Sequence, residues 1–427
     1  MVKGTRDMAD SPQAEPAAPA TEARQAHRGQ SAARAIENWM AFSRRKLRAG
    51  ELGSVPVVVV LAVVWITFQS LNENFLSPRN LSNLSVDIVG TGLIAVGIVF
   101  VLLLGELDLS VGSISGLAAA IFAVLNVNNG VPEWLALVIA VLAGMAAGTV
   151  QGYSFARTRV PAFVVTLAGL LTWNGLMLYI LGTSGTINLD ENGIVAKLTS
   201  YYFTDDAVAY GIAAVAVGLV FLVSYLDRRR RVAARMPHRS LQVIAIRAGG
   251  LAVIAFAAAY LLNRFQGLPL ALLIFLVVVA GLDIALRRTH YGRQVYALGG
   301  GVEAARRASL RVTRVQTAVL AVSGTMAAIG GLFLASRITS VSQSSGSGVL
   351  LLNAIAAAVI GGTSLFGGRG STWSAVLGML VIQSIASGMA ITDTPAAVQF
   401  MITGGVLFAA VVIDALSRRS QEAHGRA

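Results

Sequence analysis

The chain has 427 residues, of which 55% are hydrophobic and 13% charged, and its mean hydropathy is +0.70. These values depart from those of a soluble globular domain and indicate a membrane protein. The formal net charge is +12, and the absence of cysteine excludes disulfides and thiolate metal sites. The four histidines fall in tails or polar loops, which excludes an H-E-x-x-H metal helix; they are His27, His238, His290 and His424.

Residues 1–50 are rich in Ala, Pro, Gln, Arg and Glu and have no apolar periodicity. Such a composition cannot bury enough apolar surface to fold alone. The segment also contains no apolar core of a cleavable signal peptide. We therefore predict a disordered cytoplasmic N-terminal tail, which ends in the basic run "SRRKLRAG".

Residues 51–417 are predicted to form an all-α transmembrane domain with about 10 to 12 helices, because apolar runs of roughly 20 residues recur along them. Two or three runs are short enough to be broken or re-entrant. The expected spans are Val55–Leu71, Leu84–Leu104, Val111–Val127, Glu133–Ala156, Pro161–Gly182, Ala207–Leu226, Ala248–Leu262, Leu268–Leu286, Val315–Ala335, Val349–Leu365, Thr372–Ile391 and Val398–Leu416.

Basic residues fall in alternate connections of these spans, which predicts that both termini are cytoplasmic. The cytoplasmic parts would include a basic loop at 227–247, a segment at 287–314 and a C-terminal tail at 418–427. Because the arginines lie in short connections with no aromatic platform beside them, the charge does not indicate nucleic-acid binding.

The stretch "GELDLSVGS", Gly105 to Ser113, places Glu106 and Asp108 between two apolar runs. Two interpretations of Asp108 stay open, an N-cap of the following span or a residue that lines a transport pathway. A second glycine-rich break, "VIGGTSLFGGRGSTW", begins at Val359. Paired breaks of this kind are typical of transporters with two repeated halves, so a two-half repeat is possible here.

A third motif, "GRQVYALGGGVEAARRASL", follows the span that ends at Leu286, and its consecutive glycines, Gly299 to Gly301, are expected to break the chain. It predicts a short helix at Val302–Leu310, with Glu303 near its N-terminus and opposite Arg307. Such a short helix is marginal alone and must dock on something. The residues leave open whether it lies on lipid headgroups or inserts into a soluble partner.

The sequence has only three lysines, Lys3, Lys46 and Lys197, and none forms a phosphate-binding G-x-x-x-x-G-K-[ST] loop. If ATP drives this protein, another subunit must bind it. A self-contained ion-coupled carrier also stays open, because acidic residues fall at span ends. Two of these acids, Asp283 and Asp414, are expected to pair with arginines four residues further on.

These three motifs, together with "RVPAFVVTLAGLLTWNG", resemble the permease subunits of bacterial ATP-binding-cassette (ABC) importers for monosaccharides. The resemblance covers about Pro56 to Leu416, and the basic loop at 227–247 looks most like the xylose-type permeases. It implies an inner-membrane homodimer, not itself an enzyme, that works with a cytoplasmic ABC ATPase and an extracytoplasmic sugar-binding protein. This chain would hold no cofactor, since the partner ATPase would bind ATP and Mg, and its other contact would be membrane lipid.

D-xylose is the expected substrate on this resemblance. The alternatives are an ABC permease for nucleosides or branched-chain amino acids, or an ion-coupled sugar carrier. By resemblance, the coupling helix that docks on the ATPase would include Gly299, Glu303, Ala304, Ala305 and Arg306.

A sugar pathway needs amide, hydroxyl and aromatic groups on apolar walls, although ordinary interhelical hydrogen bonds use the same groups. No residue is expected to bind a metal. The candidate pathway residues are Asp108, Ser110, Trp173, Asn174, Asn353, Thr363 and Ser364. The chain departs from the family pattern at Gly105 and at "LLLNAIAAA", where relatives more often have acidic residues.

Overall fold

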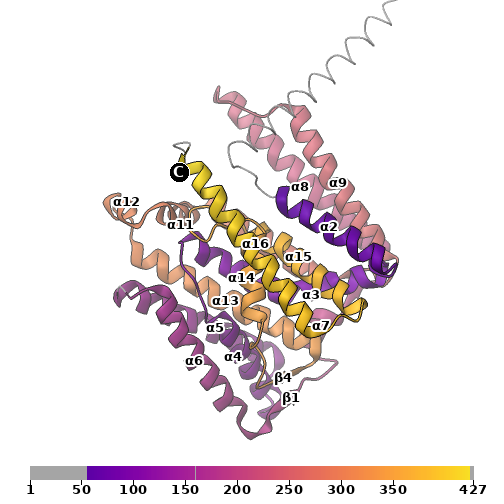
Figure 1. Cartoon of the computed structure of the whole chain (residues 1–427), viewed down its shortest axis with the longest axis vertical. Helices are drawn as coiled ribbons and strands as arrows, with labels where there is room; N and C mark the ends of the chain where they lie inside the picture. The colour runs from indigo at the N-terminus through magenta and orange to yellow at the C-terminus, as the bar shows by residue number, and fades with distance from the viewer. Residues whose placement is uncertain (1–54, 159, 424–427) are drawn as a thin grey trace, which may run out of the picture. The chain divides into compact units, whose positions relative to one another are not determined.

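The computed structural model describes residues 55–158 and 160–423, so the tail predicted at 1–50 lies outside the described residues. Within them the chain is mostly helical, with only two short pairs of strands (Figure 1). Residues Gly53–Leu416 form one compact unit. The prediction of an all-α polytopic membrane protein is confirmed by this architecture.

Nine helical segments of the described chain are long and apolar enough to cross a membrane. They are α3 (Pro78–Leu103), α4 (Val111–Ala123) with the π-helix Val124–Asn128, α5 (Glu133–Thr158), α6 (Ala162–Leu181), α8 (Asp206–Ala233), α9 (Leu241–Asn263), α10 (Leu270–Arg288), α13 (Val312–Ile338) and α15 (Thr372–Ile391). The other apolar helices are α2 (Val55–Leu71), α14 (Leu350–Ile360) and α16 (Ala396–Ala423).

Local capping explains why two helices start earlier than expected. The Ser77 hydroxyl accepts a hydrogen bond from Asn80 N at 3.3 Å, and Pro78 fits the first helical position, so α3 begins before Leu84. The Ser240 hydroxyl caps α9 in the same way, by accepting from Val243 N at 3.3 Å.

The expected basic loop at 227–247 is mostly helix, which corrects the prediction. Helix α8 continues to Ala233 and α9 begins at Leu241, so only residues 234–240 connect them. Arginine favours helix, and Arg231 Nε donates to the Asp227 carboxylate at 2.9 Å one turn earlier. A run of charges therefore extends the helix beyond its apolar part.

Helix α3 forms the centre of the unit, because nearly all of its side chains from Leu84 onward are buried. Helices α5 and α13 pack closely through glycines, and a Cβ on Gly148 would overlap the carbonyl oxygen of Leu320. Likewise, a Cβ on Gly144 would lie 2.7 Å from Gly324 O. Small residues let membrane helices approach and gain van der Waals contact where no hydrophobic effect drives them together.

One end of the bundle carries most of the arginines, and we call it the basic end. Here α8 and α10 end, α9 and α13 begin, and the short helices α11 (His290–Gly300) and α12 (Val302–Arg307) lie (Figure 1). The opposite end has two short antiparallel pairs, β1 (Thr186–Asn188) with β4 (Ser340–Ser342), and β2 (Tyr202–Phe203) with β3 (Leu268–Pro269). It also has helix α7 (Ile194–Ser200).

The segment before α14 enters the bundle as irregular chain, which explains why α14 is short. A Cβ on Gly112 of α4 would lie 2.5 Å from Gly346 O, and one on Gly116 would overlap Ser345 O. Non-helical backbone at membrane depth is tolerated only where protein covers it. The expectation that some spans are broken fits this segment, whereas the two-half repeat stays a prediction.

The α5–α13 contact yields a stability prediction. Gly148→Ala should lower the midpoint of thermal aggregation of the purified protein in detergent, because the methyl group must push α13 away, at a cost of about 1–3 kcal/mol. Fluorescence-detected size-exclusion chromatography after heating measures this. Gly218→Ala in α8 is the matched control, since no atom lies within 4 Å of its Cβ position. Equal midpoints for the two variants would show that close packing here is unimportant.

Candidate functional site

Helix α3 ends in a glycine motif at the start of "GELDLSVGS". Gly105 has φ of +76°, its N–H donates to Leu102 O at 2.8 Å, and Glu106 N donates to Val101 O at 3.3 Å. This pattern is the Schellman C-cap, which requires the left-handed conformation that glycine adopts most easily. The departure from the family pattern at Gly105 therefore has a local structural reason.

The other two glycine motifs meet α3 at this same point. Gly368 N donates to the carbonyl oxygen of Leu103 at 2.9 Å, which satisfies a group left free at the helix end. A Cβ on Gly299 of α11 would overlap that oxygen, and one on Gly367 would lie 2.8 Å from Gly299 O and 2.9 Å from Gly105 N. We call Gly105, Gly299, Gly367 and Gly368 the glycine junction.

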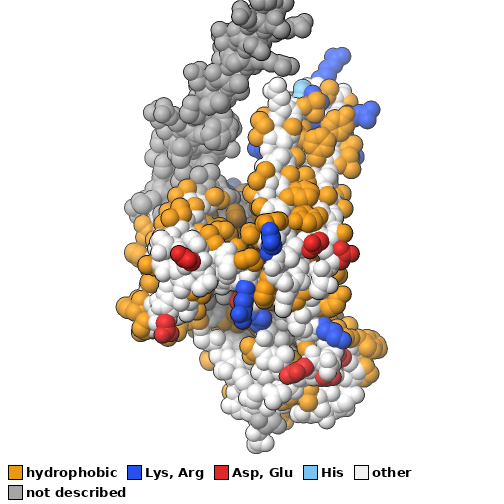
Figure 2. Space-filling view, turned by 90° about the vertical axis from the view of Figure 1, so that its right-hand side faces the viewer, with side chains coloured by type: hydrophobic (Ala, Val, Ile, Leu, Met, Phe, Trp, Pro, Cys, Tyr) orange, Lys and Arg blue, Asp and Glu red, His pale blue; other side chains and the backbone are white. Residues whose placement is uncertain are grey.

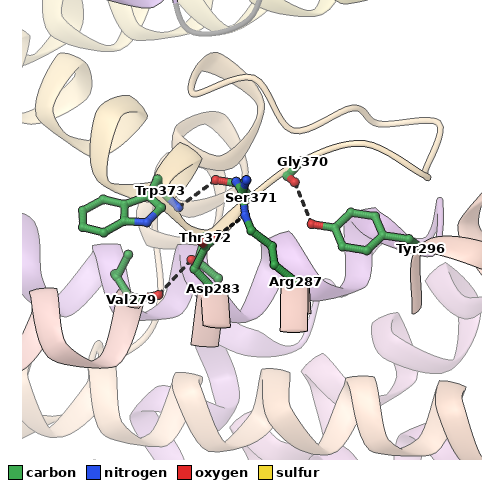
Figure 3. A network of polar contacts seen from close by, with 8 residues as sticks. All are labelled: Val279, Asp283, Arg287, Tyr296, Gly370, Ser371, Thr372 and Trp373. Atoms are coloured by element: carbon green, nitrogen blue, oxygen red, sulfur yellow. Dashed lines mark hydrogen bonds and ion pairs between the residues drawn. The ribbon is translucent and has the colours of Figure 1, made fainter. Parts of the chain in front are cut away.

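Polar contacts around the junction hold the glycine-rich loop after α14 against α10 and α11 (Figure 3). The Tyr296 hydroxyl donates to Gly370 O at 2.9 Å, and the Thr372 hydroxyl donates to Val279 O at 2.9 Å. Burial raises the pKa of Tyr296, so its hydroxyl remains a proton donor near neutral pH. The predicted pairing of Asp283 with Arg287 is confirmed, with an N–O distance of 2.9 Å.

Helix α12 presents part of the predicted coupling segment to solvent. It ends at Arg307 rather than Leu310, and the Glu303 carboxylate pairs with Arg306 at 3.2 Å instead of with Arg307. Glu303, Ala304 and Arg306 are exposed, whereas Ala305 is buried against the chain's own core. Ala305 therefore anchors α12 and cannot lie in a partner's groove, which corrects the prediction for that residue.

Gly299 also faces inward rather than toward a partner. It lies in α11, a helix that the sequence analysis did not predict, because its three consecutive glycines indicated a chain break. The amphipathic pattern of α11 was the available signal, since Val295 and Leu298 are buried on the side that faces the core. The break falls only at Gly301, after the helix has ended.

Asp108 is fully buried in the connection between α3 and α4. Its Oδ1 accepts from Ser110 N at 3.0 Å and from the Ser110 hydroxyl at 2.6 Å, and its Oδ2 accepts from the Ser323 hydroxyl at 2.8 Å. Helix α4 begins after Ser110, whose side chain makes no capping hydrogen bond, whereas Asp108 accepts from the N–H two residues on, as a capping carboxylate does. These bonds support the capping interpretation of Asp108, and its place in a transport pathway stays a prediction. Ser323 lies roughly 16 Å along α13 from its start, which places this cluster well inside the bundle.

Gln151 of α5 joins the cluster and was missed by sequence reasoning. Its amide oxygen lies 2.8 Å from the Ser110 hydroxyl, while its Nε2 is buried without a partner. The hydroxyl has one proton, which Asp108 already accepts. Exchanging the oxygen and nitrogen of the Gln151 amide satisfies this side chain better. Nε2 then donates to the Ser110 hydroxyl, and the amide oxygen takes the position on the side away from Ser110.

Gly169 of α6 provides the space on that other side. Its Cβ position would overlap Gln151 Nε2 and lie 3.2 Å from Trp173 Nε1, another buried donor without a partner. The reoriented amide oxygen thus faces an indole N–H that needs an acceptor. Asp108, Ser110, Ser323, Gln151 and Trp173 together form what we call the interior polar cluster. As the only amide in the apolar α5, Gln151 was the signal that could have identified it.

The remaining predicted pathway residues do not join this cluster. Asn174 is half-buried beside Trp173, and Asn353 of α14 has a buried Oδ1 without a partner. Thr363 and Ser364 lie in the glycine-rich loop at the basic end, where the Ser364 hydroxyl and Leu365 N donate to Asp414 at 3.4 and 3.3 Å. The predicted partner Arg418 has no described side chain.

Of the five acids at span ends that kept an ion-coupled carrier open, Asp87, Asp108, Asp283 and Asp414 have protein partners, whereas the Glu106 carboxylate forms no hydrogen bond or ion pair with the residues that the structure describes. Asp87 pairs with Arg337 at 2.8 Å, and Asp108 accepts three hydrogen bonds within its cluster. Across residues 55–158 and 160–423, no group of three or more His, Cys, Asp or Glu side chains could hold a metal ion.

The architecture is that of a multi-pass transport permease. Residues 80–411 match the family described as "Branched-chain amino acid transport system / permease component". The chain is 35% identical over 367 residues to the xylose transport system permease protein XylH of Escherichia coli, which covers 86% of this chain and 92% of that protein.

Two further relatives support the same assignment. XylH of Haemophilus influenzae is 35% identical over 378 residues, 88% of this chain and 99% of the relative. The ribose import permease protein RbsC of Bacillus subtilis is 29% identical over 363 residues, 85% and 91% of the two chains. No solved structure matches the chain significantly. The chain belongs to this permease family of ABC transporters, and the three relatives named here are sugar permeases.

The interior polar cluster yields a second prediction. Asp108→Ala should lower the thermal midpoint, since it leaves Ser110 N and Ser323 Oγ buried without a partner, at about 1–3 kcal/mol per group. Asp108→Asn should be tolerated, because its oxygen accepts from Ser110 and its amide donates to the Ser323 hydroxyl. Thermal midpoints of both variants test this. A large loss in Asp108→Asn would show that the negative charge itself is needed.

Proposed function

We propose that this protein is the membrane permease of an ATP-driven importer for a monosaccharide, with D-xylose as the first candidate. The 35% identity to XylH over most of both chains supports this choice of sugar, and the ribose permeases are more distant. The competing substrates are nucleosides and branched-chain amino acids. The competing mechanism is an ion-coupled carrier.

The single observation that carries the proposal is the glycine junction. It joins the segment that would dock on an ATPase, α11 and α12, to the break between α3 and α4. Backbones in van der Waals contact cannot move independently, because packed interiors transmit displacement. A shift of α12 caused by an ATPase would therefore reach "GELDLSVGS" through Leu103, Gly299 and Gly368.

The interior polar cluster is the place where such a shift would change a sugar pathway. Asp108 and Ser110 lie on the connection that the junction would displace, while Gln151, Trp173 and Ser323 lie on three long helices. Amide and hydroxyl side chains can donate hydrogen bonds to sugar hydroxyls and accept hydrogen bonds from them, and an indole ring can stack on the apolar face of a sugar. Asn174, Asn353, Thr363 and Ser364 are further polar groups available to the pathway.

The proposed assembly is supported by the family to which the chain belongs and by the basic residues at one end of the bundle. Two copies of the chain would form the pore in the bacterial inner membrane, with the basic end and both termini in the cytoplasm. A cytoplasmic ABC ATPase would bind ATP and Mg and contact Glu303, Ala304 and Arg306. An extracytoplasmic binding protein would deliver the sugar to the opposite end.

Affinity purification of the tagged chain from its native membrane, followed by mass spectrometry and uptake of radiolabelled D-xylose, tests this function. A stoichiometric P-loop ATPase and uptake that survives a proton ionophore support it. If the chain purifies without an ATPase and the ionophore abolishes uptake, the importer proposal is wrong and the ion-coupled carrier takes its place. Transport of a nucleoside or of leucine instead of xylose would correct the assigned substrate and leave the ATP-driven mechanism in place.

Glu303→Lys should weaken ATPase association and uptake about tenfold, or ~1.4 kcal/mol, because it reverses a charge on the exposed docking face. Co-purification of the ATPase and initial uptake rates measure this. The same substitution at Glu191, exposed at the opposite end, is the control for ATPase association. Normal association and uptake in Glu303→Lys would remove α12 from the docking surface.

Gly299→Ala should reduce uptake at least tenfold while ATPase association persists, because the methyl group would separate α11 from Leu103. Gly300→Ala is a matched control in the same helix, since no atom lies within 4 Å of its Cβ position. The change in helix propensity is the same in both variants. Equal uptake by both would show that the junction does not transmit the movement.

A further inference from the structure

A cavity of about 500 Å³ lies at the basic end, between α8, the connection 234–240, α9 and α10. None of the three motifs in the sequence accounts for it. Its lining combines cationic, polar and apolar side chains: Val223, Ser224, Asp227, Arg228, Arg231, Pro237, His238, Arg239, Ile244 and Arg288.

The cavity has an excess of unneutralised positive charge. Its one acid, Asp227, already pairs with Arg231 at 2.9 Å. Arg228, Arg239 and Arg288 form no ion pair with any residue that the structure describes. In addition, Nε of Arg228 is buried without a hydrogen-bond partner, which is costly unless a ligand accepts from it.

We propose that this cavity binds the phosphate group of an anionic phospholipid. Guanidinium groups present planar, paired N–H donors that match phosphate oxygens, and three arginines from different elements converge here. The cavity lies where apolar helices give way to basic ends, which is the depth of lipid headgroups.

The surfaces beside the cavity favour a lipid over a free anion. Val223 and Ile244 give the cavity apolar walls, and the adjoining faces of α8 and α9 expose large apolar side chains such as Leu222 and Ile246. Figure 2 shows this hairpin with extensive hydrophobic surface along its length and basic side chains at its tip. Acyl chains can lie on these faces while the phosphate occupies the cavity.

A bound phospholipid would join two parts of the chain. Arg228 and Arg239 belong to the α8–α9 hairpin, whereas Arg288 ends α10, two residues before α11 begins at His290. The headgroup would thus hold the α8–α9 hairpin against the turn between α10 and α11, where the coupling segment begins. Binding itself does not depend on which solute the permease carries.

Native mass spectrometry of the full chain tests the proposal. The protein is delipidated in detergent, incubated with phosphatidylglycerol or phosphatidylcholine, and passed through detergent exchange. Wild type should retain phosphatidylglycerol and lose phosphatidylcholine. The double variant Arg228→Gln, Arg239→Gln should retain about tenfold less phosphatidylglycerol, because it loses the donors in the cavity.

The control is Arg229→Gln, Arg230→Gln, which removes the same charge from exposed positions outside the cavity and should bind like wild type. Should the double variant fail to fold, Arg288→Gln on α10 replaces it. Equal retention by cavity and control variants, or equal retention of both lipids, would overturn the proposal. Binding of inorganic phosphate that displaces the lipid completely would reassign the cavity to a free anion.

Discussion

The structure depends on how the chain provides hydrogen-bond donors for the last backbone carbonyl groups of α3, which ends inside the protein. The carbonyl oxygen of Leu103 is left free there, and the N–H of Gly368, far along the sequence, donates to it at 2.9 Å. An unpaired carbonyl would be costly in an environment without water. This donor can approach only because Gly299 has no side chain to separate α11 from the same oxygen. Three breaks in the apolar pattern are thereby held in contact.

A second set of hydrogen bonds extends this contact into the bundle. The connection that leaves Gly105 places Asp108 and Ser110 beside Gln151 of α5 and Ser323 of α13. Helices α5 and α13 are themselves locked through Gly144, Gly148 and Gly324, so the cluster is attached to a rigid pair. An irregular connection held at both ends by rigid elements is suited to pass small displacements from one to the other.

The sequence predicts the fold well because long apolar runs determine membrane helices, and the limits of Val55–Leu71 and Thr372–Ile391 are the expected ones. Of the three glycine motifs that it predicts to be breaks, two are irregular chain, whereas Gly299 and Gly300 of the third lie in α11. It does not predict that these motifs meet, since Gly299 and Leu103 are brought together by packing rather than by any local pattern. Ala305 was misassigned because a six-residue helix does not reveal which face is buried. Gln151 was overlooked although it is the only amide in the apolar α5, and the structure shows its partner, Ser110.

Hydrogen–deuterium exchange of the permease with and without its co-purified ATPase tests the central claim most directly. If the junction connects the docking segment to the interior break, ATPase binding should change exchange in peptides covering 299–310, 361–371 and 101–110. The opposite end, including β1 and β4, should be unaffected. Changes confined to 299–310 would contradict the account, because they would show that docking on α12 does not reach "GELDLSVGS".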